Sequence, residues 1–259
     1  MTCPELLSER DGAIALITLN RPEKRNALTV PMLEAFRTAV RDVATSSDVR
    51  VLVVRSAGTA FCAGLDLKEM GLARRADGSV EYPEIEGVLH ELERCPIPTM
   101  AMMQGDAIAG GLELALHCDL RVAGAGARMG MPLAKIGLVV PFPLTQKLLD
   151  TIGTAKTKEM LFTGELLGAD EACAAGLVTR VVPDAELEAA ARALAADIAA
   201  NAPLSLRTMK AAIAEANAFR NAQPSAELAA QAAAARKSED LQEGLRAVFE
   251  KRRAVFHGR

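Results

Sequence analysis

Hydrophobic residues follow two alternating patterns over the first two-thirds of the chain. The apolar runs that are short enough to be strands covered on both faces lie at 13–19, 51–55, 101–103 and 120–123. Between them, residues 31–44 and 85–95 place apolar side chains at helical spacing, and Thr29 precedes the first of these helices as an N-cap. This alternation of strands and helices predicts an α/β fold.

The other segments are less regular or purely helical. Residues 71–87 are expected to form a surface loop, and 129–145, with several prolines and glycines, are expected to be mostly loop or single turns. Further elements are predicted as helices at 154–163 and 169–176 and a strand at 178–182. From about residue 185 the chain is alanine-rich and predicts helices alone, with no clear linker before them.

The stretch 98–123 contains a glycine pair and a charge inside an otherwise apolar segment. Gly110 and Gly111 stand where a turn enters a helix, so an outside atom can approach N–H groups that the first helical turn leaves unpaired. Such an N–H is a donor to an anion, and the helix dipole strengthens it. A Gly-Gly turn also serves purely structural roles, so the pair alone does not define a site.

Glu113 interrupts the predicted helix 112–118, whose other side chains are mostly apolar. Because helical side chains lean toward the N-terminus, Glu113 is expected to reach the space in front of Gly110. Burial raises the pKa of a carboxyl, which suits a proton shuttle working near neutral pH. The alternative is a solvated or ion-paired glutamate. His117 is either a support for Glu113 or a hydrogen-bonded core histidine.

Composition narrows the class of protein. Half of the 259 residues are apolar and 24% are charged, which fits an α/β domain and excludes disorder. The net charge of −3 gives no support for binding to nucleic acid or to an anionic membrane, and no apolar run is long enough to span a membrane. Scattered cysteines and few histidines indicate reduced thiols and no metal site. With no targeting segment visible, we expect a cytoplasmic protein.

Several motifs, taken together and in this order, resemble those of the enoyl-CoA hydratase/isomerase, or crotonase, family. They are NRPEKRNAL (20–28), AFCAGLDLKEM (60–70), QGDAIAGGLELALHCDL (104–120), MGMPLAKIGL (129–138), TGELLGADEACAAGLVTRVVP (163–183) and FEKRRAVF (249–256). The resemblance covers nearly the whole chain, and several spaced motifs are more specific than any one of them.

The resemblance implies a spiral core of repeated ββα turns, here 1–195, and a C-terminal helical region, 196–259, that supports a homotrimer, commonly within a hexamer. It also implies an acyl-CoA thioester as substrate, with coenzyme A as part of the substrate and no separate cofactor. By motif position, the backbone N–H groups of Leu65 and Gly110 hold the thioester oxygen. Glu113 matches the first of two glutamates with which hydratases of the family place and activate water.

Leu133 departs from the family pattern. It follows Pro132 where the second glutamate is expected, so concerted addition of water lacks one carboxylate, and Leu133 instead lines the acyl pocket. One carboxylate suffices in principle to move a proton between two carbons. We therefore expect double-bond isomerisation or a slow, selective hydration by a single acid/base glutamate. A non-catalytic acyl-CoA-binding or assembly protein of the same fold is the alternative.

Further contacts are implied by motif position. Lys68 and Lys251 match places where the family puts basic groups near the CoA nucleotide, and Arg25 lies in the first motif. Ordinary solvated charge explains Arg25 and Lys68 equally well. Ala63 and Phe142 are expected at the acyl pocket, which has an altered shape because proline and phenylalanine replace the family's usual glycines around Phe142.

Overall fold

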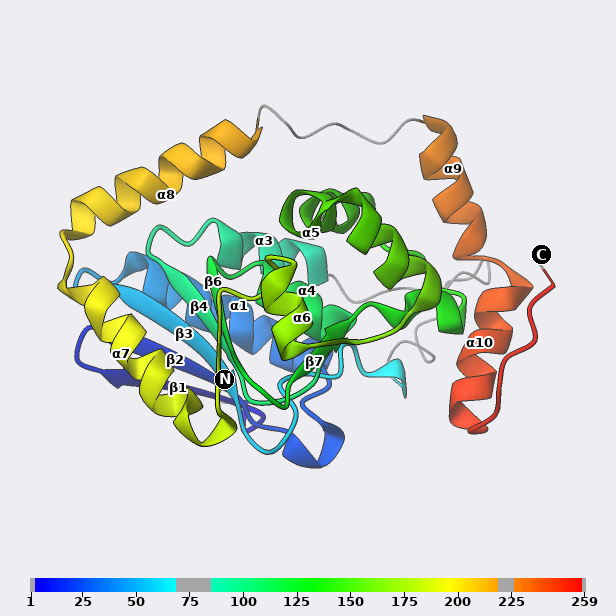
Figure 1. The fold of residues 1–259 in the computed structure, drawn as a ribbon, viewed down its shortest axis with the longest axis horizontal. Helices are drawn as coiled ribbons and strands as arrows, with labels where there is room; N and C mark the ends of the chain where they lie inside the picture. The colour runs from blue at the N-terminus through cyan, green and yellow to red at the C-terminus, as the bar shows by residue number, and fades with distance from the viewer. Residues whose placement is uncertain (1–2, 69–84, 219–225, 258–259) are drawn as a thin grey trace.

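The computed structural model describes residues 3–68, 85–218 and 226–257, and within them two sheets form the centre of the fold (Figure 1). The strands of the larger sheet, in spatial order, are β1 (Leu6–Asp11), β2 (Ile14–Leu19), β3 (Val51–Ser56), β4 (Thr99–Met103), β6 (Leu120–Gly124) and β9 (Arg180–Val182). All neighbours in it are parallel except β1 and β2. The smaller sheet orders β5 (Ala107–Ile108), β7 (Arg128–Gly130) and β8 (Leu167–Gly168).

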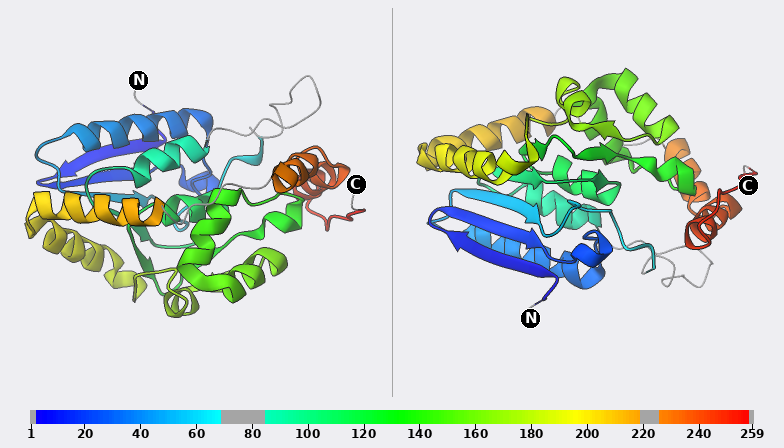
Figure 2. Two further views of the ribbon diagram at one scale, coloured as in Figure 1. Left: turned by 90° about the horizontal axis from the view of Figure 1, so that it is seen from above. Right: turned by 60° about the horizontal axis from the view of Figure 1, so that its bottom comes forward.

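Helices cover both faces of the larger sheet. α1 (Val30–Thr45) and α3 (Ile85–Glu93) lie on one face and α7 (Leu187–Ala200) lies on the other, as both views of Figure 2 show for α1 and α7. Along β3, Val51 and Val53 pack in the cluster with α7, whereas Leu52 and Val54 pack in the cluster with α1 and α3. The run is therefore continuously apolar because both faces are buried.

The remaining helices surround this core. They are η1 (Pro22–Lys24), α4 (Gly110–Leu116), η2 (Pro132–Ile136), α5 (Phe142–Thr163), α6 (Ala169–Ala174), η3 (Asp184–Glu186), α8 (Pro203–Ala218), α9 (Ala226–Ala235) and α10 (Glu239–Phe249). Every residue of α4 is buried, so this short helix runs inside the protein. In the part of the chain that is described, no helix is long and apolar enough to cross a membrane.

The predicted strands and first helix are confirmed by the structure. β2, β3, β4 and β6 lie on the four expected apolar runs, and the Thr29 hydroxyl accepts a hydrogen bond of 3.3 Å from the Met32 N–H as the N-cap of α1. α4 begins two residues earlier than expected, so both glycines lie in its first turn. The expected loop at 71–87 lies outside the described residues up to 84, and from Ile85 the chain is helical.

Two predictions differ from the structure. The expectation of loop or single turns up to 145 is wrong from Phe142 onward, because α5 begins there and continues to Thr163 across a break at Gly153, where φ is 71°. Pro143 is in its first turn, where proline costs no hydrogen bond. The edge strand β1 was not predicted, since five of its six residues are exposed and carry no apolar pattern.

α10 packs on η2 through a glycine contact. A Cβ atom at Gly244 would lie 2.2 Å from the Ile136 carbonyl oxygen, so only glycine allows this approach. Leu241 and Leu245 of α10 form a small apolar cluster with Leu67 and Leu138. The C-terminal helix therefore supports residues of the cavity described below. The division of the chain at residue 195 stays a prediction.

Candidate active site

The loop after β3 leaves one backbone N–H without an acceptor at Leu65. The Leu28 N–H donates to the Gly64 carbonyl (2.8 Å), and the Asp66 N–H donates to the Leu28 carbonyl (2.9 Å). This short parallel pairing therefore uses the residues on either side of Leu65 and not the Leu65 N–H. Among the residues that the structure describes, none accepts a hydrogen bond from the Leu65 N–H. This N–H is therefore available to a ligand.

A second free N–H lies at the start of α4. Gly110 is the first helical residue, and within the described chain its N–H has no acceptor. The preceding Ala109 has φ 50° and ψ −120°, a backbone conformation that costs a non-glycine residue of order 1–3 kcal/mol. Its N–H donates to the Gly130 carbonyl and its carbonyl accepts from the Glu113 N–H, both at 2.9 Å. These two bonds hold the strained turn that presents Gly110.

Glycines bring the two N–H groups together. A Cβ atom at Gly110 would lie 3.4 Å from the Leu65 nitrogen, which shows how closely the two segments approach. Gly64 has φ +92°, and a Cβ there would lie 3.0 Å from the Ile108 oxygen. A Cβ at Gly111 would lie 2.2 Å from the Cys62 oxygen, so this glycine is also required by close packing.

Leu65 and Gly110 both line a cavity of about 450 Å³, a size typical of small-molecule sites. Its wall is mostly apolar and comes from the loop after β3, the first turns of α3 and α4, and η2 with the residues after it. The lining residues are Ala63, Leu65, Leu67, Ile85, Glu86, Ile108, Ala109, Gly110, Glu113, Met131, Pro132, Leu133, Lys135, Ile136, Leu138, Val139, Pro141 and Arg236.

Glu113 is the buried acid of this cavity. Its residue is 7% exposed, and no donor among the described residues bonds to its carboxyl. Burial raises the pKa of Glu113 to about 7; the charge of Glu86 acts in the same direction, and the charge of Lys147 opposes both. At neutral pH the carboxyl therefore exists in both protonation states, as a proton shuttle requires.

A polar cluster lies behind Glu113. Lys147 of α5 bonds to Glu93 at the end of α3, and the Nε2 atom of His117 lies 3.9 Å from the same carboxylate. Burial and the Lys147 charge lower the pKa of His117 to about 4, so its ring is neutral at pH 7. Lys147 thus has a partner of its own and acts on Glu113 only through its charge.

The structure gathers five of the predicted site residues around one cavity: Ala63, Leu65, Gly110, Glu113 and Leu133. Phe142 is not among the described residues that line it, although its neighbour Pro141 is. Leu133 is half-buried and presents an apolar side chain.

The three predicted CoA-binding residues lie outside the cavity wall. The Arg25 guanidinium bonds to Asp106 at 2.7 Å, with 58% of its side chain exposed. Lys68 is exposed at the end of a described segment, and Lys251 follows α10 with φ 54°. Arg25 adjoins the wall only through its backbone among the described contacts, since its main-chain oxygen accepts a hydrogen bond of 3.0 Å from the Ala63 N–H.

Sequence reasoning missed three charged residues of the cavity: Glu86, Lys135 and Arg236. Each stands on the polar side of an amphipathic or irregular segment, where a charge is ordinarily solvated, so no sequence signal distinguishes it. Only the fold brings the start of α3, η2 and the end of α9 to one cavity.

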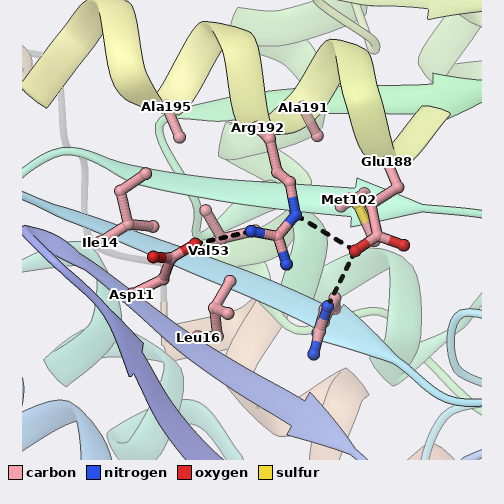
Figure 3. Close-up of a pocket in the computed structure, with 10 residues that line it drawn as sticks. Asp11, Ile14, Leu16, Val53, Met102, Glu188, Ala191, Arg192 and Ala195 are labelled. Atoms are coloured by element: carbon pink, nitrogen blue, oxygen red, sulfur yellow. Dashed lines mark hydrogen bonds and ion pairs between the residues drawn. The ribbon is translucent and has the colours of Figure 1, made fainter. Parts of the chain in front are cut away.

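A second hollow lies between α7 and the larger sheet (Figure 3) and holds about 10 Å³, room for about one water molecule. Ala191 and Ala195 face the sheet there, and Arg192 bonds to Asp11 and Glu188. Its polar groups are thus satisfied by one another. No group of three metal-ligating side chains occurs in the described residues.

The chain is similar to known proteins over most of its length. The family model described as enoyl-CoA hydratase/isomerase matches residues 9–259. The chain is 36% identical over 261 residues to the putative enoyl-CoA hydratase/isomerase YngF of Bacillus subtilis, covering 98% of each. It is 33% identical over 214 residues to the short-chain-enoyl-CoA hydratase of Clostridium acetobutylicum, covering 82% of each.

Solved structures give the same result. A crystal structure of methylmalonyl-CoA decarboxylase with 2S-carboxypropyl-CoA matches with a TM-score of 0.90 and 25% identity over 100% of both chains. An enoyl-CoA hydratase/carnithine racemase from Magnetospirillum magneticum matches with a TM-score of 0.77 and 34% identity, over 100% of this chain and 97% of the other. The architecture is therefore the crotonase-like α/β fold predicted from the sequence. The chain belongs to the enoyl-CoA hydratase/isomerase family and is an enzyme of the crotonase type.

Proposed function

We propose that the protein acts on an acyl-CoA thioester through an enolate intermediate. The Leu65 and Gly110 N–H groups hold the thioester oxygen, and the Glu113 carboxyl moves the proton at the neighbouring carbon. The observation that carries this proposal is the buried carboxyl of Glu113, which bonds to none of the described residues, in a cavity lined by Leu65 and Gly110, whose N–H groups have no acceptor in the same part of the chain.

The energetics support this assignment. A backbone donor aimed at a developing oxyanion contributes about 2.7–4 kcal/mol to lowering the barrier, and here two of them converge. A positioned acid/base adds roughly 10²–10⁴-fold, with the best effect when its pKa is near the working pH. The pKa of Glu113, raised to about 7 by burial, meets that condition.

We favour isomerisation of a 3-enoyl-CoA to a 2-enoyl-CoA, because Glu113 alone can take the proton from one carbon and return it to another. Hydration of a 2-enoyl-CoA is the second reaction, supported by the relatives described as hydratases. Leu133 in the cavity wall leaves the place after Pro132 without a carboxylate. A non-catalytic acyl-CoA-binding protein is the competing function.

The test compares wild type with Glu113→Gln on series of 3-enoyl-CoA and 2-enoyl-CoA substrates, with binding of the thioesters measured in parallel. We expect turnover by wild type, loss of about 10²–10⁴-fold in the variant, and retained binding. Binding without any turnover by wild type would support the binding protein instead. Unchanged turnover in Glu113→Gln would remove Glu113 from the mechanism.

We also propose a homotrimer, alone or paired in a hexamer. α8 lies at the edge of the molecule (Figure 1) and exposes Leu204, Met209 and Ile213 by 78%, 54% and 63%. Met209 and Ile213 are one helical turn apart and share a face, and exposed apolar side chains on one face are typical of a surface that another chain covers. Analytical ultracentrifugation of wild type and of Met209→Glu tests this, and a monomeric wild type would contradict it.

The basic residues and the compartment complete the proposal. The CoA nucleotide would bind outside the cavity to Lys68, Lys251 and Arg25. Arg25 would give up its ion pair with Asp106 to do so. Phe142 would shape the acyl site through its neighbour Pro141. Charge reversal at Lys68 should raise KM more than it lowers kcat. A cytoplasmic location stays a prediction, tested by cell fractionation.

A further inference from the structure

The cavity contains a second carboxylate, which belongs to Glu86 in the first turn of α3. This turn lies directly against the first turn of α4, since the Cδ1 atom of Ile85 is 3.2 Å from the place where a Cβ of Gly110 would stand. Glu86 is the next residue and lines the same space as Glu113 and Gly110. Two acids from different helices therefore face one substrate site.

The two acids have different surroundings. Glu113 is almost fully buried, whereas Glu86 is exposed at the solvent side of the cavity. The charge of Glu86 contributes to the raised pKa of Glu113, which places the two groups within electrostatic reach of each other. Burial favours the protonated form of a carboxyl, so the buried Glu113 is suited to act as the acid. The exposed Glu86 is then suited to act as the base.

Other groups of the cavity cannot supply the second proton transfer. Of the described residues in its wall, Glu86 and Glu113 are the carboxylates, and Lys135 and Arg236 are cations. Leu133 has no ionisable group. Glu93 lies behind the site, bonded to Lys147.

We propose that Glu86 is a second catalytic residue, the base that activates water for addition to the β-carbon of a bound 2-enoyl-CoA. This inference rests on the proposed function, because Glu113 and the two N–H groups must already hold and protonate the thioester. It gives the protein a hydration activity beside isomerisation, with the two carboxylates of hydration supplied by α3 and α4.

The proposed addition of water conserves protons and electrons. Glu86 takes a proton from water while the water oxygen bonds to the β-carbon, and the double-bond electrons move to the thioester oxygen between the Leu65 and Gly110 N–H groups. The enolate then collapses as the α-carbon takes the proton of Glu113. Water is added across the bond, and Glu86 and Glu113 exchange protons with solvent to start again.

The experiment measures two reactions of the same protein: formation of 3-hydroxyacyl-CoA from a 2-enoyl-CoA, and conversion of a 3-enoyl-CoA to a 2-enoyl-CoA. The variants are Glu86→Gln, Glu113→Gln and Glu34→Gln. Glu34 is a matched control, because it is also an exposed helical glutamate but pairs with Arg37 away from the cavity. Circular dichroism and binding of the thioester establish that each variant is folded.

We expect Glu86→Gln to lower kcat for hydration by about 100-fold, and to lower the ratio of hydration to isomerisation at least about tenfold. The pH profile of isomerisation should also move to lower pH, because the variant removes a negative charge near Glu113. Glu34→Gln should change neither reaction.

Three results would overturn the assignment of Glu86: hydration unchanged in Glu86→Gln, both reactions lowered by the same factor, or a wild type that isomerises without hydrating. None of these touches the proposed function, which fails only if Glu113→Gln keeps full turnover or if wild type turns over neither substrate. The two failures are therefore distinguishable.

Discussion

The Nδ1 atom of His117 lies 2.8 Å from the main-chain oxygen of Glu113, so the imidazole caps the end of α4 and does not touch the Glu113 carboxyl. Of the two roles considered for this histidine, the structure thus favours a hydrogen-bonded core residue. The bond also requires a proton on Nδ1, which leaves Nε2 facing Glu93 at 3.9 Å.

His117 should remain neutral down to about pH 4, because burial and the charge of Lys147 lower its pKa to about 4. The unfolded chain binds this proton at about pH 6.5, so the folded protein should lose stability as pH falls from about 6.5 to 4. An NMR titration of the histidine rings, assigned with His117→Gln, measures it. A ring that titrates near pH 6.5 would contradict the prediction.

Glu113 should have the opposite effect on stability. Its pKa is about 7 in the folded protein against 4.5 as a free group, so the folded state holds a proton that the unfolded state has lost between those values. Stability should therefore fall by roughly 3 kcal/mol as pH rises from 4.5 to above 7. Urea unfolding of wild type and Glu113→Gln across this range isolates the contribution, since glutamine cannot titrate. Identical pH dependence in both proteins would exclude it.

The two reactions should depend on pH with opposite sign. Isomerisation begins with Glu113 as a carboxylate, so its kcat/KM should rise through about pH 7, whereas hydration needs the protonated form and should fall there. Steady-state kinetics on both substrates between pH 5 and 9, a range of about four units around the pKa, checks this. Parallel profiles would mean that Glu113 has one fixed protonation state in both.

Gly64→Ala should disrupt the oxyanion donors. Its φ of +92° disfavours alanine, and the new Cβ would lie 3.0 Å from the Ile108 oxygen, so we expect a loss of about 1–3 kcal/mol in stability and about 100-fold in kcat. Gly12→Ala is the control, because Gly12 has φ +59° but no atom within 4 Å of a Cβ. Thermal unfolding and kinetics of both variants suffice. Equal losses of stability and of kcat in the two variants would show that close packing at Gly64 contributes to neither.

Leu133→Glu should supply the carboxylate that the sequence lacks after Pro132. Leu133 lines the cavity, so the new group would face the same space as Glu113. In a Glu86→Gln background we expect hydration to recover about tenfold or more, with a cost in stability because the site is half-buried. Leu133→Gln is the matched control without a titratable group. Recovery by the glutamine variant as well would show that the effect is not proton transfer.

The sequence predicts those strands and helices whose burial leaves a clear pattern of apolar and polar residues. Val51 to Val54 read as a covered strand because their side chains pack on two sides, and Glu113 stood out because it is a charge in a helix with no exposed face. Glu86 carried no such signal. Its place in the cavity depends on α3 and α4 meeting at Gly110, a contact between residues far apart in the sequence.

Proline position explains the main error in the fold. Pro141 and Pro143 predict a break in helical structure, yet they stand at the N-cap and in the first turn of α5, where the ring replaces an N–H that has no partner. Gly153 then separates two helical stretches, of which the sequence pattern predicts only the second, at 154–163. The position of Pro141 in the cavity wall follows from its place at the start of α5.

The contact of α10 with the Ile136 carbonyl places the last helix against the wall of the cavity, in a small apolar cluster separate from the main core. Selection acting on this helix can therefore retune chain-length preference at little expense to folding. Relatives that differ chiefly in α10, eleven residues or about three helical turns, would then diverge in what they consume while keeping how they react.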